Sequence, residues 1–189
     1  MDNLILASQS PRRQHLMEEA GYTFNVIVSD VDETNPAGMP GMEVPEHLAH
    51  KKAVAVATQF PDAIIVAADT IVLLGNELLG DEILGKPIDS EDAIAMLQRL
   101  SGKMHRVVTG VCILKKNKVE KFSVTTEVYF RKLTVAQIQY YITKYKPFDK
   151  AGSYAIQEWI GMIGIEKING DYYNVMGLPI GEVAKRLPL

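Results

Sequence analysis

The stretch Leu4-Ile5-Leu6-Ala7-Ser8-Gln9-Ser10-Pro11-Arg12-Arg13 passes from an apolar run to serines, a proline and two arginines. The apolar run is typical of a buried strand. Pro11 suits the first position of a helix, with Ser10 as its N-cap. We therefore predict a strand over residues 3–7, followed by a helix from Pro11 to about Ala20 that ends at Gly21.

Arg12 and Arg13 fall in the first turn of that helix, where the helix dipole favours negative charge. Each cation there costs roughly 0.3–1 kcal/mol at an exposed helix end. A bound phosphate would offset this cost, because backbone N–H groups, serine hydroxyls and guanidinium groups together bind anions. The alternative is an ordinary cap with two solvated arginines.

The composition limits the classes of partner. A net charge of −3 argues against non-specific binding to nucleic acid or to an anionic membrane. The single cysteine, Cys112, excludes an intrachain disulfide and favours a reducing compartment. Residues 1–3 lack the positive charge of a secretory leader, and the longest apolar run, residues 63–74, is too short to span a bilayer. We predict a cytoplasmic protein with one domain over residues 1–189.

The rest of the chain alternates between helix and strand patterns. Further helices are predicted from Pro45 to about Gln59, from a cap at Ser90 to about Leu100, from the capping box of Thr134 and Gln137 to about Tyr145, and after Pro179. Strands are predicted over residues 24–28, 63–74 with a bend at Asp69-Thr70, 105–114, 119–131 and 162–168, with a loop over 29–42 and a hairpin turn at Gly75-Asn76. This order favours an α/β sheet with helices on its flanks.

Two acids are candidates for chemistry. Asp69 stands in the apolar run of residues 64–72, and a carboxylate removed from water must be paired, protonated or bound to a metal. Alternatively, Asp69-Thr70 is a turn in which the carboxylate caps a backbone amide. Glu33 belongs to the acidic run of residues 30–33. One member of such a run can help to hold a hard divalent cation, although the run can also be simply solvated.

Two lysines are candidates for anion binding. Lys52 shares a helix face with Leu48 and Val56, so its ammonium either extends to water or meets an anion. Lys86 stands between a glycine and a proline, where it can reach a phosphate as a point charge or remain solvated. Two arginines, two lysines and two acids together suit a triphosphate with a divalent cation.

Several ordered segments carry a resemblance to a known family. They are Ser8-Gln9-Ser10-Pro11-Arg12-Arg13, Lys52-Ala53, Ala68-Asp69-Thr70-Ile71-Val72, Gly85-Lys86-Pro87, Leu100-Ser101-Gly102, Thr109-Gly110-Val111, Lys150-Ala151-Gly152-Ser153-Tyr154-Ala155-Ile156-Gln157 and Asn174-Val175-Met176-Gly177-Leu178-Pro179. Over nearly its whole length the chain resembles the Maf family of nucleotide pyrophosphatases.

The resemblance implies an enzyme that uses Mg²⁺ or Mn²⁺ to hydrolyse nucleoside triphosphates to the monophosphate and pyrophosphate, which prevents incorporation of non-standard nucleotides. It implies an α/β fold with an elongated, curved mixed β-sheet, flanking helices and two lobes around a cleft, as in ITPase-like proteins. Residues 69–70 and 150–157 look like the branch that acts on dTTP, UTP and modified pyrimidine nucleotides. The alternatives are a 7-methyl-GTP-type pyrophosphatase and a nucleotide-binding regulator of septum formation.

The resemblance also assigns roles by position. Asp69 is the expected catalytic base and, with Glu33, a ligand of the metal. The expected substrate-binding residues are Ser8, Arg12, Arg13, Lys52, Thr70, Lys86 and Gln157. Arg12, Thr70 and Gln157 match positions tied to substrate choice, although the amide of Gln157 could instead bond to local backbone.

Some features of the chain depart from the family pattern or leave the assembly open. Glu158 stands where many relatives have glycine, and it would repel a triphosphate if it faced the cleft; Asp171 stands where relatives often have serine. A nucleoside triphosphate is the expected partner, and neither nucleic acid nor a membrane is expected. Four tyrosines could serve a homodimer interface or pack within the protein: Tyr140, Tyr141, Tyr172 and Tyr173.

Overall fold

The chain forms two compact units. The computed structural model describes residues 3–34, 36–76, 80–116 and 118–189. Unit 1 comprises residues 1–70, 109–124 and 177–189, and unit 2 comprises residues 71–108 and 125–176. The chain therefore leaves unit 1 and returns to it twice, and each unit has a hydrophobic core of its own.

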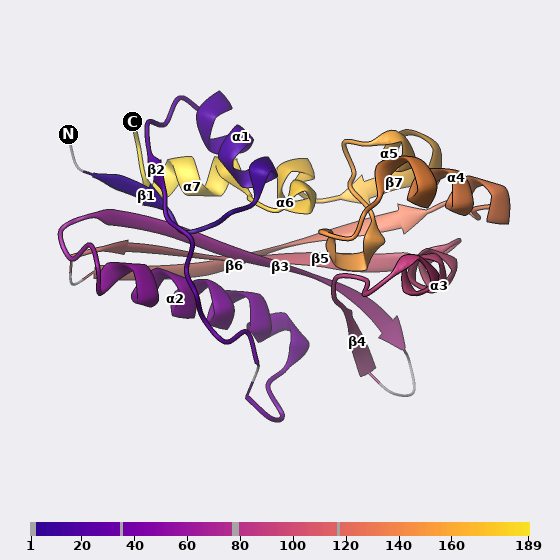
Figure 1. Cartoon of the computed structure of the whole chain (residues 1–189), viewed down its shortest axis with the longest axis horizontal. Coiled ribbons are helices and arrows are strands. Elements are labelled where there is room, and N and C mark those ends of the chain that lie inside the picture. The colour runs from indigo at the N-terminus through magenta and orange to yellow at the C-terminus, as the bar shows by residue number, and fades with distance from the viewer. Residues whose placement is uncertain (1–2, 35, 77–79, 117) are drawn as a thin grey trace. The chain divides into compact units, whose positions relative to one another are not determined.

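A mixed β-sheet provides the framework (Figure 1). Its strands are β1 (Leu4–Leu6), β2 (Asn25–Val26), β3 (Ile64–Asn76), β4 (Gly80–Leu84), β5 (Met104–Lys115), β6 (Lys118–Phe130) and β7 (Ile165–Asn169). The strand order is β2-β1-β3-β5-β6-β7, with β4 paired to β3. β1 is parallel to β2 and β3, whereas β4 runs antiparallel to β3 and β7 antiparallel to β6.

Helices flank this sheet, so the predicted α/β class with a mixed sheet is confirmed. They are α1 (Pro11–Glu19), α2 (Val44–Ala57), α3 (Ser90–Leu100), α4 (Val135–Tyr145), α5 (Trp159–Gly164), α6 (Tyr172–Met176) and α7 (Ile180–Arg186), with short 3-10 turns at Gly41–Glu43 and Ala151–Ser153. The capping box of Thr134 and Gln137 is present at the start of α4. α1 ends as predicted, because Gly21 adopts the left-handed conformation with φ of +86°.

In unit 1, α2 covers one face of the strands, and α1 and α7 lie on the other (Figure 1). The core under α2 uses small and branched side chains: Ile5, Ala7, Ala49, Ala53, Val56, Ala63, Ile65, Ala67, Cys112 and Leu114. A Cβ on Gly110 would lie 2.1 Å from the backbone nitrogen of Glu46, so this glycine lets the first turn of α2 approach β5 closely. Burial raises the pKa of the Cys112 thiol to about 11.

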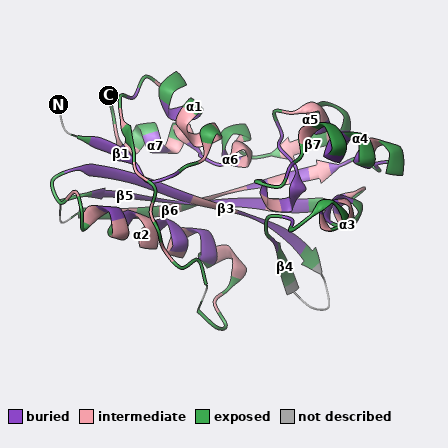
Figure 2. Ribbon diagram, viewed as in Figure 1, coloured by how far each residue is buried: buried purple, intermediate pink, exposed green. Residues whose placement is uncertain are grey.

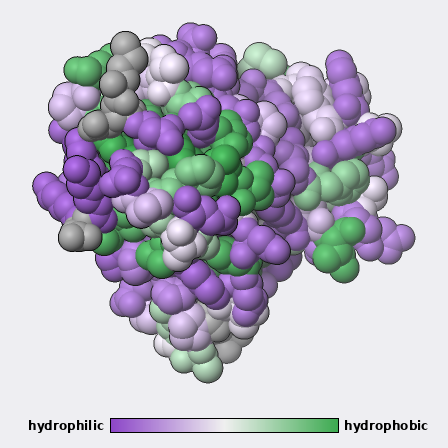
Figure 3. Space-filling model, turned by 60° about the vertical axis from the view of Figure 1, so that its left-hand side comes forward, coloured by the Kyte–Doolittle hydropathy of each residue, from purple (hydrophilic) through white to green (hydrophobic). Residues whose placement is uncertain are grey.

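In unit 2, larger side chains from α3, α4 and the adjoining strands form the core. Its fully buried members include Leu97, Leu100, Ile138, Tyr141 and Ile160. Buried residues follow β3 and β5 along most of their length (Figure 2). Hydrophilic residues cover most of the face drawn in Figure 3, with a group of hydrophobic ones among them. Within the described residues, no helix is both long and apolar enough to cross a membrane.

The structure corrects several local predictions. β3 continues through Asp69-Thr70, where a bend was expected, and through Gly75 and Asn76, which pair with Asp81 and Gly80 of β4 instead of forming the turn. The side chain of Asp89, and not that of Ser90, caps α3 by accepting a hydrogen bond from the N–H of Asp92 at 2.8 Å. The short helices α5 and α6 were not predicted.

His105 is a fully buried histidine in unit 2. Its Nε2 lies 2.7 Å from the hydroxyl of Tyr154, and its ring makes edge contacts with Phe130 and Tyr154 at centroid distances of 5.0 and 5.4 Å. Among the described residues, its Nδ1 has no hydrogen-bond partner. Burial lowers the pKa of His105 from 6.5 to about 3, because the charged imidazolium would lose its hydration.

This burial predicts a loss of stability in acid. Below pH 6.5 His105 is protonated in the unfolded chain, whereas in the folded chain it stays neutral down to about pH 3. The free energy of unfolding therefore decreases as the pH falls from 6.5 to about 3. Each pH unit costs up to about 1.4 kcal/mol. In urea unfolding at pH 7 and pH 4.5, we expect the stability difference to be about 2–3 kcal/mol smaller in His105→Gln than in the wild type. An equal difference in both proteins would contradict this account.

Candidate functional site

Unit 1 contains two clusters of polar side chains, one on each face of the sheet, and adjacent residues of β3 contribute one side chain to each cluster. Successive side chains of a strand point to opposite faces of its sheet. Asp69 therefore follows Ile65 and Ala67 toward α2, and Thr70 points toward the side of α1. The contacts agree, because Asp69 bonds to Lys52 of α2 and Thr70 bonds to Arg13 of α1. One strand thus supplies a side chain to each of the two groups.

On the α2 side, the ammonium of Lys52 lies between two carboxylates. Its Nζ is 2.6 Å from Oδ1 of Asp69 and 2.8 Å from Oε1 of Glu33. The side chains of Lys52 and Asp69 are only 12% and 14% exposed, whereas Glu33 is 56% exposed. The paired state predicted as one option for Asp69 is therefore present, and both predicted metal ligands lie within reach of one cationic group.

A second lysine holds the acidic segment against α2. Lys51 donates a hydrogen bond from Nζ to the backbone carbonyl of Asp32. The carboxylate of Asp32 accepts hydrogen bonds from the N–H and the hydroxyl of Thr34 at 2.9 and 2.6 Å. These two bonds lower the pKa of Asp32. The segment that carries Glu33 is thus attached to α2 at Asp32 as well as at Glu33, and Thr34 bonds back to Asp32.

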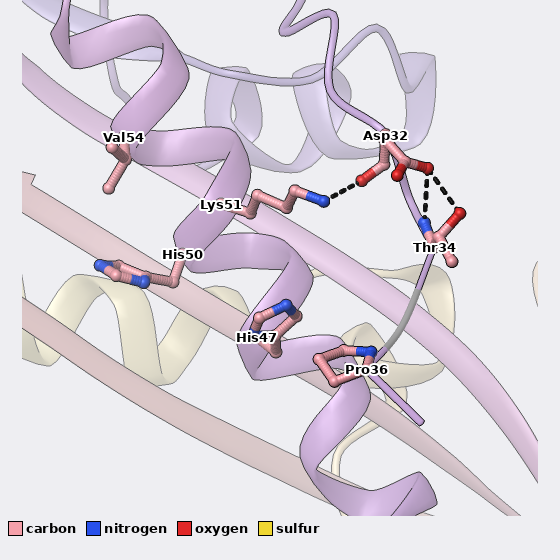
Figure 4. A pocket seen from close by; sticks show the side chains of 7 residues that line it. All are labelled: Asp32, Thr34, Pro36, His47, His50, Lys51 and Val54. Carbon is pink, nitrogen blue, oxygen red and sulfur yellow. Dashed lines mark hydrogen bonds between the residues drawn. The ribbon is translucent and has the colours of Figure 1, made fainter. Parts of the chain in front are cut away.

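A pocket of about 540 Å³ lies between this segment and α2 (Figure 4). It is lined by Asp32, Thr34, Pro36, His47, His50, Lys51 and Val54. Asp32 accepts hydrogen bonds from both Thr34 and Lys51, as Figure 4 shows. None of the predicted site residues lines this pocket, so it is separate from the ion-paired group.

On the α1 side, the guanidinium of Arg13 ties three distant segments together. It donates to the carbonyl of Gly177 at 2.7 Å, to the hydroxyl of Ser8 at 3.2 Å and to the hydroxyl of Thr70 at 3.0 Å. The hydroxyl of Thr70 also lies 2.9 Å from that of Thr109. Burial lowers the pKa of Arg13, and the nearby carboxylates of Asp69 and Glu33 act in the opposite direction.

Thr109 and the carbonyl of Gly177 were not among the predicted site residues. Both lie in segments that carry the resemblance, which was the available signal, but a backbone carbonyl leaves no mark in a sequence. The expected cap of α1 is also different. Ser10 makes no side-chain cap, and the hydroxyl of Ser8 accepts a bond from the N–H of Ser10 at 3.2 Å. Arg12 is half-buried in the first turn of the helix, where it was placed.

The other two predicted residues, Lys86 and Gln157, belong to unit 2 and are exposed. The backbone links their segments, because the N–H of Gly152 donates to the carbonyl of Gly85 at 3.0 Å. A Cβ on Gly152, which has φ of +68°, would lie 3.0 Å from the side chain of Val72. Only a glycine fits this close and left-handed position without strain.

The charge of Glu158, a departure from the family pattern, is balanced inside unit 2. Its carboxylate accepts a hydrogen bond from the hydroxyl of Tyr141 and lies 3.5 Å from Nζ of Lys150. Asp171 has a local role instead, since its carboxylate accepts from the N–H of Tyr173 at 2.7 Å and its carbonyl from the hydroxyl of Thr126 at 2.9 Å.

The contacts of Arg13 predict a structural role that lysine cannot replace. A lysine has a single nitrogen and cannot reach the carbonyl and both hydroxyls as the forked guanidinium does. Since hydrogen bonds to charged groups contribute about 1.5–3 kcal/mol each, we expect Arg13→Lys to lose about 2–4 kcal/mol of stability in urea unfolding.

The matched control is Arg99→Lys, which alters an exposed ion pair with Glu82. Exposed pairs contribute about 0–1 kcal/mol, so this variant should unfold almost as the wild type does. Equal stability of the two variants would show that Arg13 does not hold the three segments together.

Comparison with known proteins assigns the sequence to a family. The family model described as Maf-like protein matches residues 3–188. A protein of Cytophaga hutchinsonii named dTTP/UTP pyrophosphatase is 47% identical over 185 residues, which cover 98% of this chain and 83% of the relative. A protein of Parabacteroides distasonis with the same name is 47% identical over 186 residues, covering 97% and 94%.

A solved structure supports the fold. The Staphylococcus aureus Ham1 protein superposes with a TM-score of 0.50 at 17% identity, over 68% of this chain and 72% of that chain. At that identity the likeness concerns the fold alone. The match of the family model over residues 3–188, together with relatives of nearly half-identical sequence over almost the full length, shows that the chain belongs to the Maf family.

Proposed function

We propose that this protein hydrolyses nucleoside triphosphates, with dTTP and UTP as its main substrates, to the nucleoside monophosphate and pyrophosphate. The relatives named dTTP/UTP pyrophosphatase support the reaction and the choice of nucleotide. The structural observation that carries the proposal is the group of Lys52, Asp69 and Glu33, in which two carboxylates and one ammonium meet at 2.6 and 2.8 Å.

The donor set of this group fits a divalent metal. Magnesium prefers hard oxygen ligands and is commonly bound by one or two carboxylates, with substrate phosphates and waters completing the octahedron. Asp69 and Glu33 provide two such carboxylates, and an oxygen of each lies within 2.8 Å of Nζ of Lys52. The described residues contain no cluster of three or more metal-binding side chains. We propose that these two residues hold Mg²⁺ or Mn²⁺, which would neutralise phosphate charge and polarise the phosphoryl oxygens.

In the proposed reaction, water attacks the α-phosphorus of the triphosphate. A new P–O bond forms from the water oxygen while the bond from the α-phosphorus to the oxygen bridging it to the β-phosphate breaks, and pyrophosphate leaves with that electron pair. Asp69 is the proposed acceptor of the proton of the attacking water, and Lys52 donates a hydrogen bond to its Oδ1. The ion pair with Lys52 also fixes the orientation of this carboxylate.

The remaining predicted residues would bind and orient the substrate. A triphosphate carries close to four negative charges, and Arg12, Lys52 and Lys86 are the proposed partners of these phosphates. Arg13 donates to the hydroxyls of Ser8 and Thr70. We propose that these three residues form one wall of the phosphate site and that the further N–H groups of Arg13 face the substrate. Gln157, which has both donor and acceptor groups, is the proposed reader of the pyrimidine edge.

The cellular setting follows from the substrate. Because nucleoside triphosphates are made and used in the cytoplasm, we propose that location for the enzyme. A homodimer remains part of the proposal, with the exposed Tyr140, Tyr172 and Tyr173 as candidate contacts.

A panel of nucleoside triphosphates tests the proposed function. Pyrophosphate release should be fastest with dTTP and UTP in the presence of Mg²⁺ or Mn²⁺, and it should stop when EDTA removes the metal. Faster release from 7-methyl-GTP would assign the protein to the alternative substrate. Nucleotide binding without release from any member of the panel would refute the enzymatic proposal in favour of a nucleotide-binding regulator.

Asp69→Asn tests the catalytic base. The amide keeps the size of the side chain but cannot accept the proton, so we expect kcat to fall by about 10²–10⁴-fold, the usual contribution of general acid–base catalysis. Binding of dTTP in calorimetry should change much less than kcat.

The matched control is Asp81→Asn, which also removes a strand carboxylate from an ion pair, here with Arg106. Its kcat should stay near that of the wild type. Near-normal turnover in Asp69→Asn would remove Asp69 from the role of base.

A further inference from the structure

The turn of residues 155–158, which carries Gln157, is fixed on both sides of that residue. The N–H of Glu158 donates to the carbonyl of Ala155 at 3.1 Å, and the N–H of Gly161 donates to the carbonyl of Glu158 at 2.9 Å. Ala155 and Ile156 are buried, whereas the side chain of Gln157 is exposed. Gln157 is therefore the exposed member of a turn whose other residues are buried or hydrogen-bonded.

The hydroxyl of Tyr141 bonds to both ends of this turn. Tyr141 lies in α4 and is fully buried. Its hydroxyl accepts a hydrogen bond from the N–H of Ala155 at 3.1 Å and donates to the carboxylate of Glu158. Burial, and then the bond to Glu158, raise the pKa of Tyr141, so the hydroxyl keeps the proton that it donates. One phenol group thus spans the turn from its first residue to its last.

Further contacts surround this hydroxyl and the turn. Nζ of Lys150, whose side chain is only 9% exposed, lies 3.5 Å from Oε1 of Glu158 and 2.7 Å from the carboxylate of Asp149. The ring of Tyr141 stacks on that of Tyr145 with a centroid distance of 5.1 Å and an angle of 25°. Trp159, next to Glu158, packs against Tyr140 at 4.8 Å. The turn is therefore attached to α4 through consecutive residues of both segments.

We propose that Tyr141 and Glu158 form a clamp that positions Gln157 for nucleotide discrimination. The inference rests on the proposed function, because it assigns these two buried groups to the selectivity of the same reaction. Tyr141 and Glu158 are positioning residues, since they act on the nucleobase through the conformation of Gln157. With the clamp intact, the amide of Gln157 is presented in one orientation. Without it, the turn samples several orientations and the hydrogen bonds that distinguish uracil from cytosine weaken.

The test measures selectivity and local exchange in Tyr141→Phe, which loses the hydroxyl and keeps the ring. Relative to the wild type, the UTP/CTP ratio of kcat/KM should fall by about three- to tenfold, toward the ratio of Gln157→Ala. This is the loss expected when one neutral hydrogen bond between Gln157 and the nucleobase is weakened. Hydrogen exchange at the amide of Ala155 should speed up by about tenfold, because that amide loses its acceptor. Tyr145→Phe, which removes a hydroxyl one turn further along α4, should change neither quantity.

A second pair of variants tests the clamp even if Tyr141→Phe does not fold. Glu158→Ala should reproduce the loss of selectivity, and Glu158→Gln, which still accepts a hydrogen bond from Tyr141, should restore most of it. An unchanged UTP/CTP ratio in Tyr141→Phe or Glu158→Ala, with pyrophosphate release by the wild type, would overturn the inference alone. Absence of release by the wild type would overturn the proposed function and the inference with it.

Discussion

The ion pair between Lys52 and Asp69 is the constraint on which the site of unit 1 depends. Both side chains are almost withdrawn from water, and a buried charge without a partner destabilises a fold by several kcal/mol, about 3–5 when one member of a pair is removed. Each of the two charges is therefore stabilised by the other, and Lys52 has Glu33 as a second partner. The pair favours the register of α2 over β3 in which Lys52 reaches the strand at the position of Asp69.

Glu33 extends this constraint to a segment without regular secondary structure. The segment lies against α2 through Lys52 at Glu33 and through Lys51 at Asp32, so two adjacent lysines hold two adjacent acids. On the other side of β3, Arg13 joins residues that are up to 164 positions apart in the chain. The polar groups of unit 1 are thus assembled by charges that have partners in the protein before any ligand binds.

The sequence predicted the parts of this arrangement that depend on local chemistry. Asp69 in an apolar run required pairing, protonation or a metal, and Lys52 on an apolar helix face had an anion as one of its two options; the structure pairs the two residues, which the sequence did not predict. The capping box at Thr134 is complete within four residues and was predicted correctly. The family assignment followed from short ordered segments, and it was confirmed over residues 3–188. The expected cleft and the residue roles stay predictions.

Other features could not be predicted because they are decided by tertiary contacts. Asp89 and Ser90 are both good caps, and the extended backbone of Asp89 decides between them. The sequence Trp-Ile-Gly-Met-Ile-Gly of α5 has two glycines and β-branched residues, which disfavour a helix until its buried Ile160 packs into the core of unit 2. One partner of Arg13 is the backbone carbonyl of Gly177. Because every residue has a backbone carbonyl, the sequence does not indicate which one Arg13 bonds to.

The buried thiol of Cys112 has a practical consequence. The thiolate is the reactive form of cysteine, and a thiol with a pKa near 11 that is inaccessible to solvent scarcely forms it at neutral pH. Maleimide dyes will therefore react very slowly with Cys112 in the folded protein and will label a cysteine introduced at the surface instead. Fluorophores can thus be attached without first replacing Cys112. When the core under α2 opens, Cys112 becomes accessible to the same reagents, so its rate of labelling measures that opening.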